Sequence, residues 1–223
     1  MIQHPICGVT CYMDESIQSC ETDEALYHES LVHPALSSTP SLKRVLIIGG
    51  GEGATLREVV KWPQVESIDM IDWDEEIVSL FQTTYPQWAK GAWKDPRVTL
   101  HIKDIFEEIL TPPSVPYDCI IVDLFDPTPD TMKQWSILLK YLPHWISAIG
   151  SMVFYTGTEE CDVHRMLQES PLLSTHHLIH YHVPIQSFSG DAMFALFTRD
   201  RSFSHSPSDP CEIWRAYIEA IVR

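Results

Sequence analysis

A short apolar segment that runs directly into a glycine-rich turn most constrains the fold. Residues 44–48, RVLII, form a continuous apolar run rich in β-branched residues, which is typical of a strand buried on both faces. The turn GGGEG follows at residues 49–53, and the next residues, ATLREVVKW, have the apolar spacing of a helix. A strand, a glycine turn and a helix in this order predict a parallel α/β sheet. The glycines also let a ligand approach the backbone beside a helix N-terminus.

Strand and helix patterns alternate along the rest of the chain. They predict a doubly wound, mostly parallel, seven-stranded sheet with helices on both faces. The expected strands are 44–48, 66–71, 97–102, 118–123, 150–155, 177–183 and 192–198, and the expected helices are 23–36, 54–62, 74–83, 104–110, 130–142, 159–168 and 210–222. Residues 1–22 stand apart as a short N-terminal β appendage, and residues 23–223 form one Rossmann-like domain.

Length, charge and composition narrow the class of protein. The 223 residues fit one domain with a sizeable core and a small appendage. A net charge of −16 argues against binding to nucleic acid, and no apolar run is long enough to span a membrane. The N-terminus lacks the pattern of a signal peptide, and the six cysteines include no CxxC pair. We therefore expect a cytoplasmic protein with reduced thiols.

Acidic residues follow the first three strands of the predicted domain. Glu52 lies inside the glycine turn, where it would repel a pyrophosphate but would suit a ligand that carries a cation. Asp72 ends the next strand, where an acid accepts hydrogen bonds from ribose hydroxyls, and Asp104 follows the third strand, placed to meet an adenine amino group. Together these acids predict an adenosine site without a phosphate. The alternative for Asp74, Asp104 and Asp130 is that each caps a helix.

A further acidic pair follows the fourth predicted strand. In DCIIVDLFDP, residues 118–127, Asp123 falls at the carboxyl end of the apolar run, where open α/β sheets bind ligands, and Asp126 follows in the loop. Two carboxylates beside an adenosine site suit a cationic amine, which they can bind and deprotonate, because an alkylamine with a pKa of about 10.4 must lose a proton to become a nucleophile. The alternative for Asp126 is a simple Asp-Pro turn.

These stretches together resemble the polyamine aminopropyltransferases, the spermidine synthase family. The resemblance rests on DEALYHESLVHPAL at 23–36, RVLIIGGGEGATLREVVKWPQVESIDMIDWDEEIV at 44–78, VTLHIKDIFEEI at 98–109 and YDCIIVDLFDP at 117–127. It continues weakly to SFSGDAMFALFTRD at 187–200 and covers roughly residues 12–198. It implies a fold like that of class I S-adenosylmethionine-dependent methyltransferases. It also implies transfer of an aminopropyl group from decarboxylated S-adenosylmethionine, as co-substrate, to putrescine or a related polyamine, with release of methylthioadenosine. The implied partners are a small cationic amine and a second copy of the chain in a homodimer, with no metal.

The resemblance also assigns a role to each matching residue. Asp123, helped by Tyr27, would orient and deprotonate the attacking amine. Asp126 would bind the far ammonium group of the acceptor, and Glu52 would meet the aminopropyl ammonium group. The remaining positions are Gln18 and Asp72 at the ribose, Asp104 at the adenine, His28 at the substrate, and Gly49, Gly50, Gly51, Gly53 and Ile105 at the cofactor.

The chain departs from the family pattern at four places. Glu52 stands where the family usually has Asp, and Asp72 stands where it usually has Glu. Residues 128–130, TPD, replace a common glycine-proline turn, and residues 187–188, SF, lie near the place of a late-loop tyrosine. Since only residues 1–22 precede the first predicted helix, we expect a short form that lacks most of the family's N-terminal β domain.

Two other functions remain open. A methyltransferase can share this fold, but ordinary S-adenosylmethionine carries a carboxylate that Glu52 would repel. A homologue that binds the nucleotide without turnover is the second alternative. His177, His180 and His182 share one predicted strand, where His180 and His182 lie on one face and could hold a metal. No third ligand of the usual kind is near them in the sequence, so we prefer a strand with scattered histidines.

Overall fold

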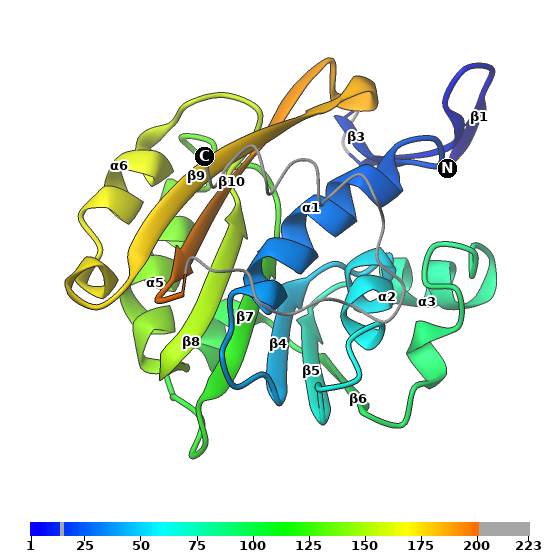
Figure 1. Cartoon of the computed structure of the whole chain (residues 1–223). Coiled ribbons are helices and arrows are strands. Elements are labelled where there is room, and N and C mark those ends of the chain that lie inside the picture. Colours follow the sequence, from blue (N-terminus) through cyan, green and yellow to red (C-terminus); the bar gives the residue numbers. More distant parts are fainter. Residues whose placement is uncertain (14–15, 201–223) are drawn as a thin grey trace.

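The computed structural model of the chain describes residues 1–13 and 16–200. Its centre is a seven-stranded sheet with the strand order β6-β5-β4-β7-β8-β10-β9 (Figure 1). The strands are β4 (Arg44–Gly49), β5 (Ser67–Asp72), β6 (Val98–Ile102), β7 (Tyr117–Asp123), β8 (Ile146–Tyr155), β9 (His177–Ile185) and β10 (Gly190–Thr198). Neighbouring strands are parallel from β6 to β8, and β10 is antiparallel to both β8 and β9. The mostly parallel, seven-stranded sheet predicted from the sequence is confirmed.

Helices connect these strands and pack against the sheet, and Figure 1 shows α1 lying across one of its faces. The helices are α1 (Glu24–Ser37), α2 (Ala54–Val60), α3 (Glu75–Thr83), α4 (Ile105–Glu108), α5 (Met132–Tyr141) and α6 (Asp162–Gln168). In the described residues the 3₁₀ turns are η1 (Ala92–Lys94), η2 (Leu142–His144), η3 (Pro171–Ser174) and η4 (Gln186–Phe188). The predicted alternation of strands and helices therefore holds through the described part of the domain.

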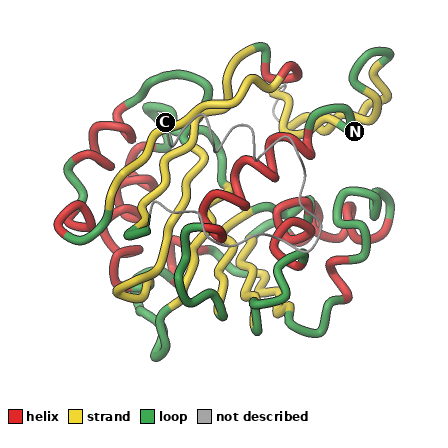
Figure 2. The backbone as a smooth tube through the Cα atoms, in the orientation of Figure 1, coloured by secondary structure: helices red, strands yellow, loops and turns green. Residues whose placement is uncertain are grey.

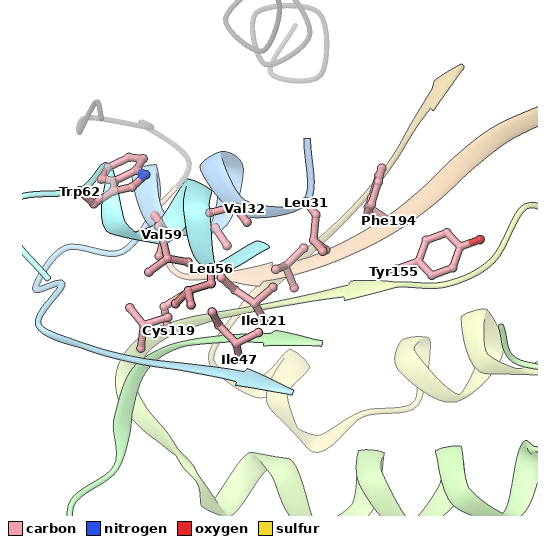
Figure 3. Close-up of a cluster of buried hydrophobic side chains, with 14 of the residues drawn as sticks. Leu31, Val32, Ile47, Leu56, Val59, Trp62, Cys119, Ile121, Tyr155 and Phe194 are labelled. Carbon is pink, nitrogen blue, oxygen red and sulfur yellow. The ribbon is translucent and has the colours of Figure 1, made fainter. Parts of the chain in front are cut away.

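Side-chain alternation along the central strands divides the core between the two faces of the sheet. On β4, Val45 and Ile47 face the cluster formed with α1 and α2, whereas Leu46 and Ile48 face the cluster formed with α5 and α6. Figure 3 shows the first cluster, in which helix side chains such as Leu56 pack onto the strand side chains. Burial on both faces explains why β4 reads as a continuous apolar run.

The connections leave the centre of the sheet in opposite directions. From β4 they lead outward to β5 and β6, and from β7 they lead outward to β8, so β4 and β7 flank the topological switch point. Open α/β sheets bind ligands beside the carboxyl ends of the strands at such a point. There the last residues of the two strands, Gly49 and Asp123, are register partners.

A small antiparallel sheet at the N-terminus precedes this domain. Its strands are β1 (Ile2–His4), β2 (Gly8–Met13) and β3 (Ser16–Cys20), in the order β1-β2-β3, and Figure 2 shows them projecting at the N-terminal end of α1. The indole nitrogen of Trp88 donates to the Ser19 hydroxyl at 2.9 Å, and Cys11 packs with Phe81 and Trp88. The predicted β appendage is confirmed, and these contacts anchor it to the larger domain.

Some element boundaries differ from the predictions. β8 begins at Ile146 rather than at 150, because its first half is partly exposed and pairs with β7 around a register shift, which obscures the apolar pattern. α4 is a single turn rather than 104–110, since the prolines of the following TPPSVP segment disfavour helical backbone. α6 begins at Asp162 rather than at 159. The predicted helix 210–222 lies outside the described residues.

Two expectations drawn from composition bear on the described residues. Each helix in the described part of the chain is too short or too polar to span a lipid bilayer. The cysteines at positions 7, 11, 20, 119 and 161 are free thiols. Burial raises the pKa of the Cys119 thiol above its usual value, so this sulfur serves as an apolar core group.

Candidate active site

The glycine loop docks directly against the carboxyl end of β7. The Gly50 amide donates to the carbonyl oxygen of Asp123 at 3.1 Å, and Gly49 has a φ of 81°. A Cβ atom at Gly49 would lie 2.1 Å from that same carbonyl oxygen. Only glycine fits both the left-handed backbone and this close approach. Packing of the loop against β7 therefore explains Gly49 and brings the loop beside Asp123.

Asp123 is the centre of the candidate site. Its Oδ1 accepts a hydrogen bond from the Tyr27 hydroxyl at 2.9 Å, and its Oδ2 accepts one from the Thr55 hydroxyl at 2.5 Å. Tyr27 belongs to α1 and Thr55 to the first turn of α2, so three elements meet at this carboxylate. The two donors fix the orientation of the carboxylate, and each oxygen can still accept from a ligand.

Tyr27 is buried among aromatic rings. Its ring centroid lies 5.3 Å from that of Tyr155, 5.7 Å from Phe188 and 5.6 Å from Phe194. Burial, and then the charge of Asp123, raise the pKa of Tyr27 well above its usual value. The hydroxyl therefore stays protonated and acts as a donor to Asp123.

The turn between β9 and β10 is tied to the start of α1. The backbone amide and the hydroxyl of Ser187 donate to the two carboxylate oxygens of Asp23, at 2.7 and 2.9 Å. This connection holds the turn against α1 and seats Phe188 on Tyr27. An aromatic ring without a hydroxyl thus occupies the late turn, at the place where the sequence departs from the family.

Glu52 extends from the glycine loop toward α1. Its Oε1 lies 2.6 Å from Nε2 of His28, and the same nitrogen lies 4.0 Å from Oδ2 of Asp123. Both partners are largely enclosed, with side-chain exposures of 3% for His28 and 13% for Glu52. The structure therefore brings together Tyr27, His28, Glu52 and Asp123, four of the predicted site residues.

Asp72 contacts the other side of the loop. Its carboxylate accepts a hydrogen bond from the amide of Asp74 at 2.9 Å, and the Gly51 amide also favours its ionised form. A Cβ atom at Gly51 would lie 2.8 Å from Asp72 Oδ2, so the loop approaches this acid closely. Burial raises the pKa of Asp72 against the effect of these amides, and the charge of Asp123 adds to the rise. The loop is held between Asp72 and Asp123.

Asp126 is exposed in the loop that follows β7. Burial, and then the negative charge of Asp126, raise the pKa of Tyr155 above its usual value. A cavity of about 640 Å³ lies beside the next residues, lined by 127–129, Met132 and 160–162. Its size is that of a small-molecule site. Asp126 therefore stands between the Asp123 cluster and open space.

Three predicted positions have no contact with this cluster in the described structure. Gln18 lies exposed on β3, where its amide donates to the Ser16 carbonyl oxygen at 3.5 Å. Ile105 is buried in the core cluster formed with α5. Asp104 is exposed beyond the end of β6. The roles of all three at a bound nucleoside stay predictions.

The capping alternative holds for two of the three acids to which it applied. Asp74 accepts from two amides of α3, both at 3.0 Å, and Asp104 accepts from the Phe106 amide at 2.8 Å. For Asp130 the alternative is wrong, because Thr131 occupies the N-cap position of α5. Capping explains why Asp104 lies where it does, and it leaves lone pairs for another donor.

Sequence reasoning missed four residues that shape the cluster. Thr55 donates to Asp123, Tyr155 interacts electrostatically with Asp126, and Glu24 and Arg57 lie behind His28. The spacing of Glu24 and His28, four residues apart on one helix, was a usable signal. Tyr155 ends the strand beside β7, a position of the same kind as that of Asp123.

Two histidines of β9 contact other side chains. His182 Nδ1 lies 2.5 Å from a carboxylate oxygen of Asp191, and the His180 ring lies 5.6 Å from that of His164. Within residues 1–13 and 16–200, no three His, Cys, Asp or Glu side chains are arranged to hold a metal ion.

Fold and site together define a class of protein. This is a doubly wound α/β domain whose switch point presents carboxylates where a dinucleotide-binding fold would cradle phosphates. The spermine/spermidine synthase domain model matches residues 24–186, which include α1, the glycine loop and Asp123. The chain belongs to this family, and the resemblance predicted from the sequence is confirmed.

Individual relatives agree with this assignment. The chain is 49% identical over 122 residues to polyamine aminopropyltransferase 1 of Hyperthermus butylicus, covering 54% of this chain and 42% of the relative. It is 45% identical over 153 residues to the polyamine aminopropyltransferase of Pyrobaculum aerophilum, covering 67% and 51%. The chain thus spans about half the length of the relatives it matches.

Solved structures support the fold. Spermidine synthase from Thermotoga maritima matches with a TM-score of 0.80 at 23% identity, over 99% of this chain and 79% of that one. A spermidine synthase in complex with the transition state analogue AdoDATO matches with a TM-score of 0.80 at 24% identity, over 97% and 79%. At these identities the likeness establishes the architecture.

The close contact between Gly49 and β7 can be tested by substitution. We expect Gly49→Ala to lower the free energy of unfolding by about 3 kcal/mol or more, because the added Cβ meets a backbone oxygen in a left-handed conformation. Urea denaturation measures this. Gly190→Ala is the matched control, since a Cβ there has no neighbour closer than 4.0 Å, and its stability should be nearly unchanged. Equal losses in both variants would contradict the account of the loop.

Proposed function

We propose that the chain acts as a polyamine aminopropyltransferase, which moves an aminopropyl group from decarboxylated S-adenosylmethionine to putrescine or a related polyamine and releases methylthioadenosine. The observation that carries the proposal is the Asp123 carboxylate, oriented by Tyr27 and Thr55 at the switch point and 4.0 Å from the His28 ring that binds Glu52. Family membership and the names of the relatives support it.

The carboxylates suit two cationic substrates. Glu52 would accept a hydrogen bond from the aminopropyl ammonium group, and Asp126 would bind the far ammonium group of the acceptor, beside the cavity at 127–129. An ionised carboxylate and an ammonium group form a strong, charge-assisted pair when both are shielded from water. The remaining contacts to the nucleoside fall to Gln18, Asp72, Asp104, Ile105 and the loop of Gly49, Gly50, Gly51 and Gly53.

The proposed reaction is a displacement at the carbon next to the sulfonium. Asp123 takes a proton from the acceptor ammonium, and the freed nitrogen lone pair forms a C–N bond. The C–S bond breaks, and its electrons neutralise the sulfonium and leave methylthioadenosine. Because the sulfonium already activates the carbon, the protein mainly supplies proximity and a site shielded from water. Tyr27, held protonated by burial, keeps Asp123 oriented.

Asp123→Asn tests the proposed base. We expect turnover to fall by about a hundredfold or more, because the amide cannot take a proton, while methylthioadenosine binding is nearly kept. Release of methylthioadenosine from decarboxylated S-adenosylmethionine is measured with putrescine, spermidine, agmatine or cadaverine. Asp118→Asn is the matched control, since Asp118 lies at the opposite end of β7 and accepts from the Lys43 and Arg44 amides. Turnover that survives in Asp123→Asn would show that another group is the base.

Absence of product with every amine in the unmodified protein would overturn the proposed activity. Nucleoside binding without turnover would then indicate a non-catalytic homologue. Methyl transfer from ordinary S-adenosylmethionine would indicate a methyltransferase on the same fold.

Glu52→Gln tests the choice of cofactor. We expect the variant to bind decarboxylated S-adenosylmethionine about tenfold more weakly, through loss of one charge-assisted hydrogen bond, and to lose its discrimination against ordinary S-adenosylmethionine. Titration calorimetry with both cofactors gives the two affinities. Glu66→Gln is the control, because Glu66 is an exposed surface acid paired with Lys43. An unchanged preference in Glu52→Gln would remove Glu52 from the ammonium site.

The proposed assembly is a homodimer, in keeping with the family resemblance. Light scattering from the purified chain measures the mass in solution directly. A mass of one chain at the concentrations used for assays would contradict the proposed dimer.

A further inference from the structure

His28 is enclosed by oxygen atoms on both sides of its ring. Nδ1 lies 2.6 Å from the backbone carbonyl oxygen of Glu24 and 3.1 Å from the Glu24 carboxylate, and Nε2 lies 2.6 Å from the Glu52 carboxylate. A carbonyl oxygen and an ionised carboxylate only accept hydrogen bonds. Each ring nitrogen must therefore carry a proton to make its contact, so the geometry describes an imidazolium.

Glu24 is in turn held by a buried guanidinium group. Nη1 and Nη2 of Arg57 each donate to a different carboxylate oxygen of Glu24, both at 2.9 Å. Arg57 also donates to Glu58, at 2.7 Å, and to the carbonyl oxygen of Trp88, at 2.6 Å. Its side chain is 5% exposed and that of Glu24 is 10% exposed. The fork of Arg57 thus fixes the carboxylate that faces His28.

The charged and titratable groups that face His28 come from every element packed against it. Glu24 and Tyr27 lie on α1, Glu52 on the glycine loop and Asp123 on β7. Burial alone would lower the pKa of His28, but the carboxylates of Glu52 and Glu24 outweigh burial and raise it well above its usual value. The direction agrees with the proton count from geometry.

We propose that Glu24, clamped by Arg57, is a positioning residue that keeps the His28 ring doubly protonated against Glu52, so that His28 and a ligand ammonium group compete for one carboxylate. The competition rests on the proposed function, which places the aminopropyl ammonium group at Glu52. In the structure, His28 Nε2 contacts Glu52 Oε1 at 2.6 Å. An arriving ammonium group favours the form of His28 that has lost a proton.

This coupling has a definite sign. A ligand that lowers the proton affinity of His28 must bind more weakly when His28 is protonated, because the two effects are reciprocal. The affinity for a cationic ligand therefore rises with pH, by at most about tenfold per pH unit, until His28 is neutral in the free protein. Methylthioadenosine carries no ammonium group, so its affinity should stay flat over the same range.

Nitrogen NMR of ring-labelled histidine in the ligand-free protein tests the first half of the inference without any activity. We expect His28 to remain doubly protonated through neutral pH, and its titration midpoint to fall by about one pH unit or more in Glu24→Gln. Glu24→Asp, which restores the charge, should recover most of that shift. A purely structural role of Glu24 would lower the melting temperature without moving the midpoint.

Asp69→Asn is the matched control, because Asp69 also contacts one arginine and one histidine, Arg44 and His101, away from this site. It should leave the His28 titration unchanged. An unmodified protein whose His28 titrates near its usual value would overturn the inference, and this measurement needs no variant to fold. An unchanged midpoint in Glu24→Gln would overturn it as well.

The second half is tested by calorimetry of decarboxylated S-adenosylmethionine and methylthioadenosine across the His28 titration. We expect the first affinity alone to rise with pH, and the rise to move to lower pH in Glu24→Gln. Equal pH profiles for the two ligands would overturn the competition. Failure of the proposed function would be distinct, because it would leave the NMR titration intact while no amine yields methylthioadenosine.

Discussion

The site depends on the close contact between the glycine loop and the carboxyl end of β7. The Gly49 backbone passes so near the Asp123 carbonyl oxygen that no Cβ fits, and the Gly50 amide donates to the same oxygen. This contact fixes where α2 begins and so places Thr55 beside the Asp123 carboxylate. The strand order makes β4 and β7 neighbours at the topological switch point, so the loop after β4 and the carboxyl end of β7 lie side by side.

Gathering several carboxylates in a shielded place has a cost, since burial disfavours their ionised forms. The fold offsets that cost with cations and donors from the helices on one face of the sheet. The Arg57 side chain on α2 is only 5% exposed and pairs with Glu24. Tyr27 and Thr55 donate hydrogen bonds to Asp123. The polar residues inside two otherwise buried helices are therefore explained by the acids that they face. Removing one partner would leave a buried charge without a counter-charge, and such a change strongly lowers the free energy of unfolding.

The sequence predicts the fold well because its signals are local: apolar runs for buried strands, glycines for the first turn and acids at strand ends. Asp123 could be found because the apolar run 119–122 shows where its strand stops. Arg57 and Glu24 could not be paired, since they lie 33 residues apart and meet only once α1 crosses α2. The role of Asp104 could not be decided from the sequence, because an acid at a helix start gives the same pattern whether it only caps the helix or also binds a ligand.

The two acids that depart from the family pattern, Glu52 and Asp72, can both be explained by their contacts in the structure. Glu52, a methylene longer than Asp, reaches from the loop to His28, at 2.6 Å. Asp72, a methylene shorter than Glu, is held by the amide of Asp74 and lies so close to the loop that a Cβ at Gly51 would be 2.8 Å from its Oδ2. The longer arm makes Glu52 the end of a series of alternating charge that runs from Arg57 through Glu24 and His28. Because His28 already contacts Glu52, the ammonium group proposed to bind there would compete with the last cation of this series, and Glu24 and Arg57 set how strongly His28 holds its proton.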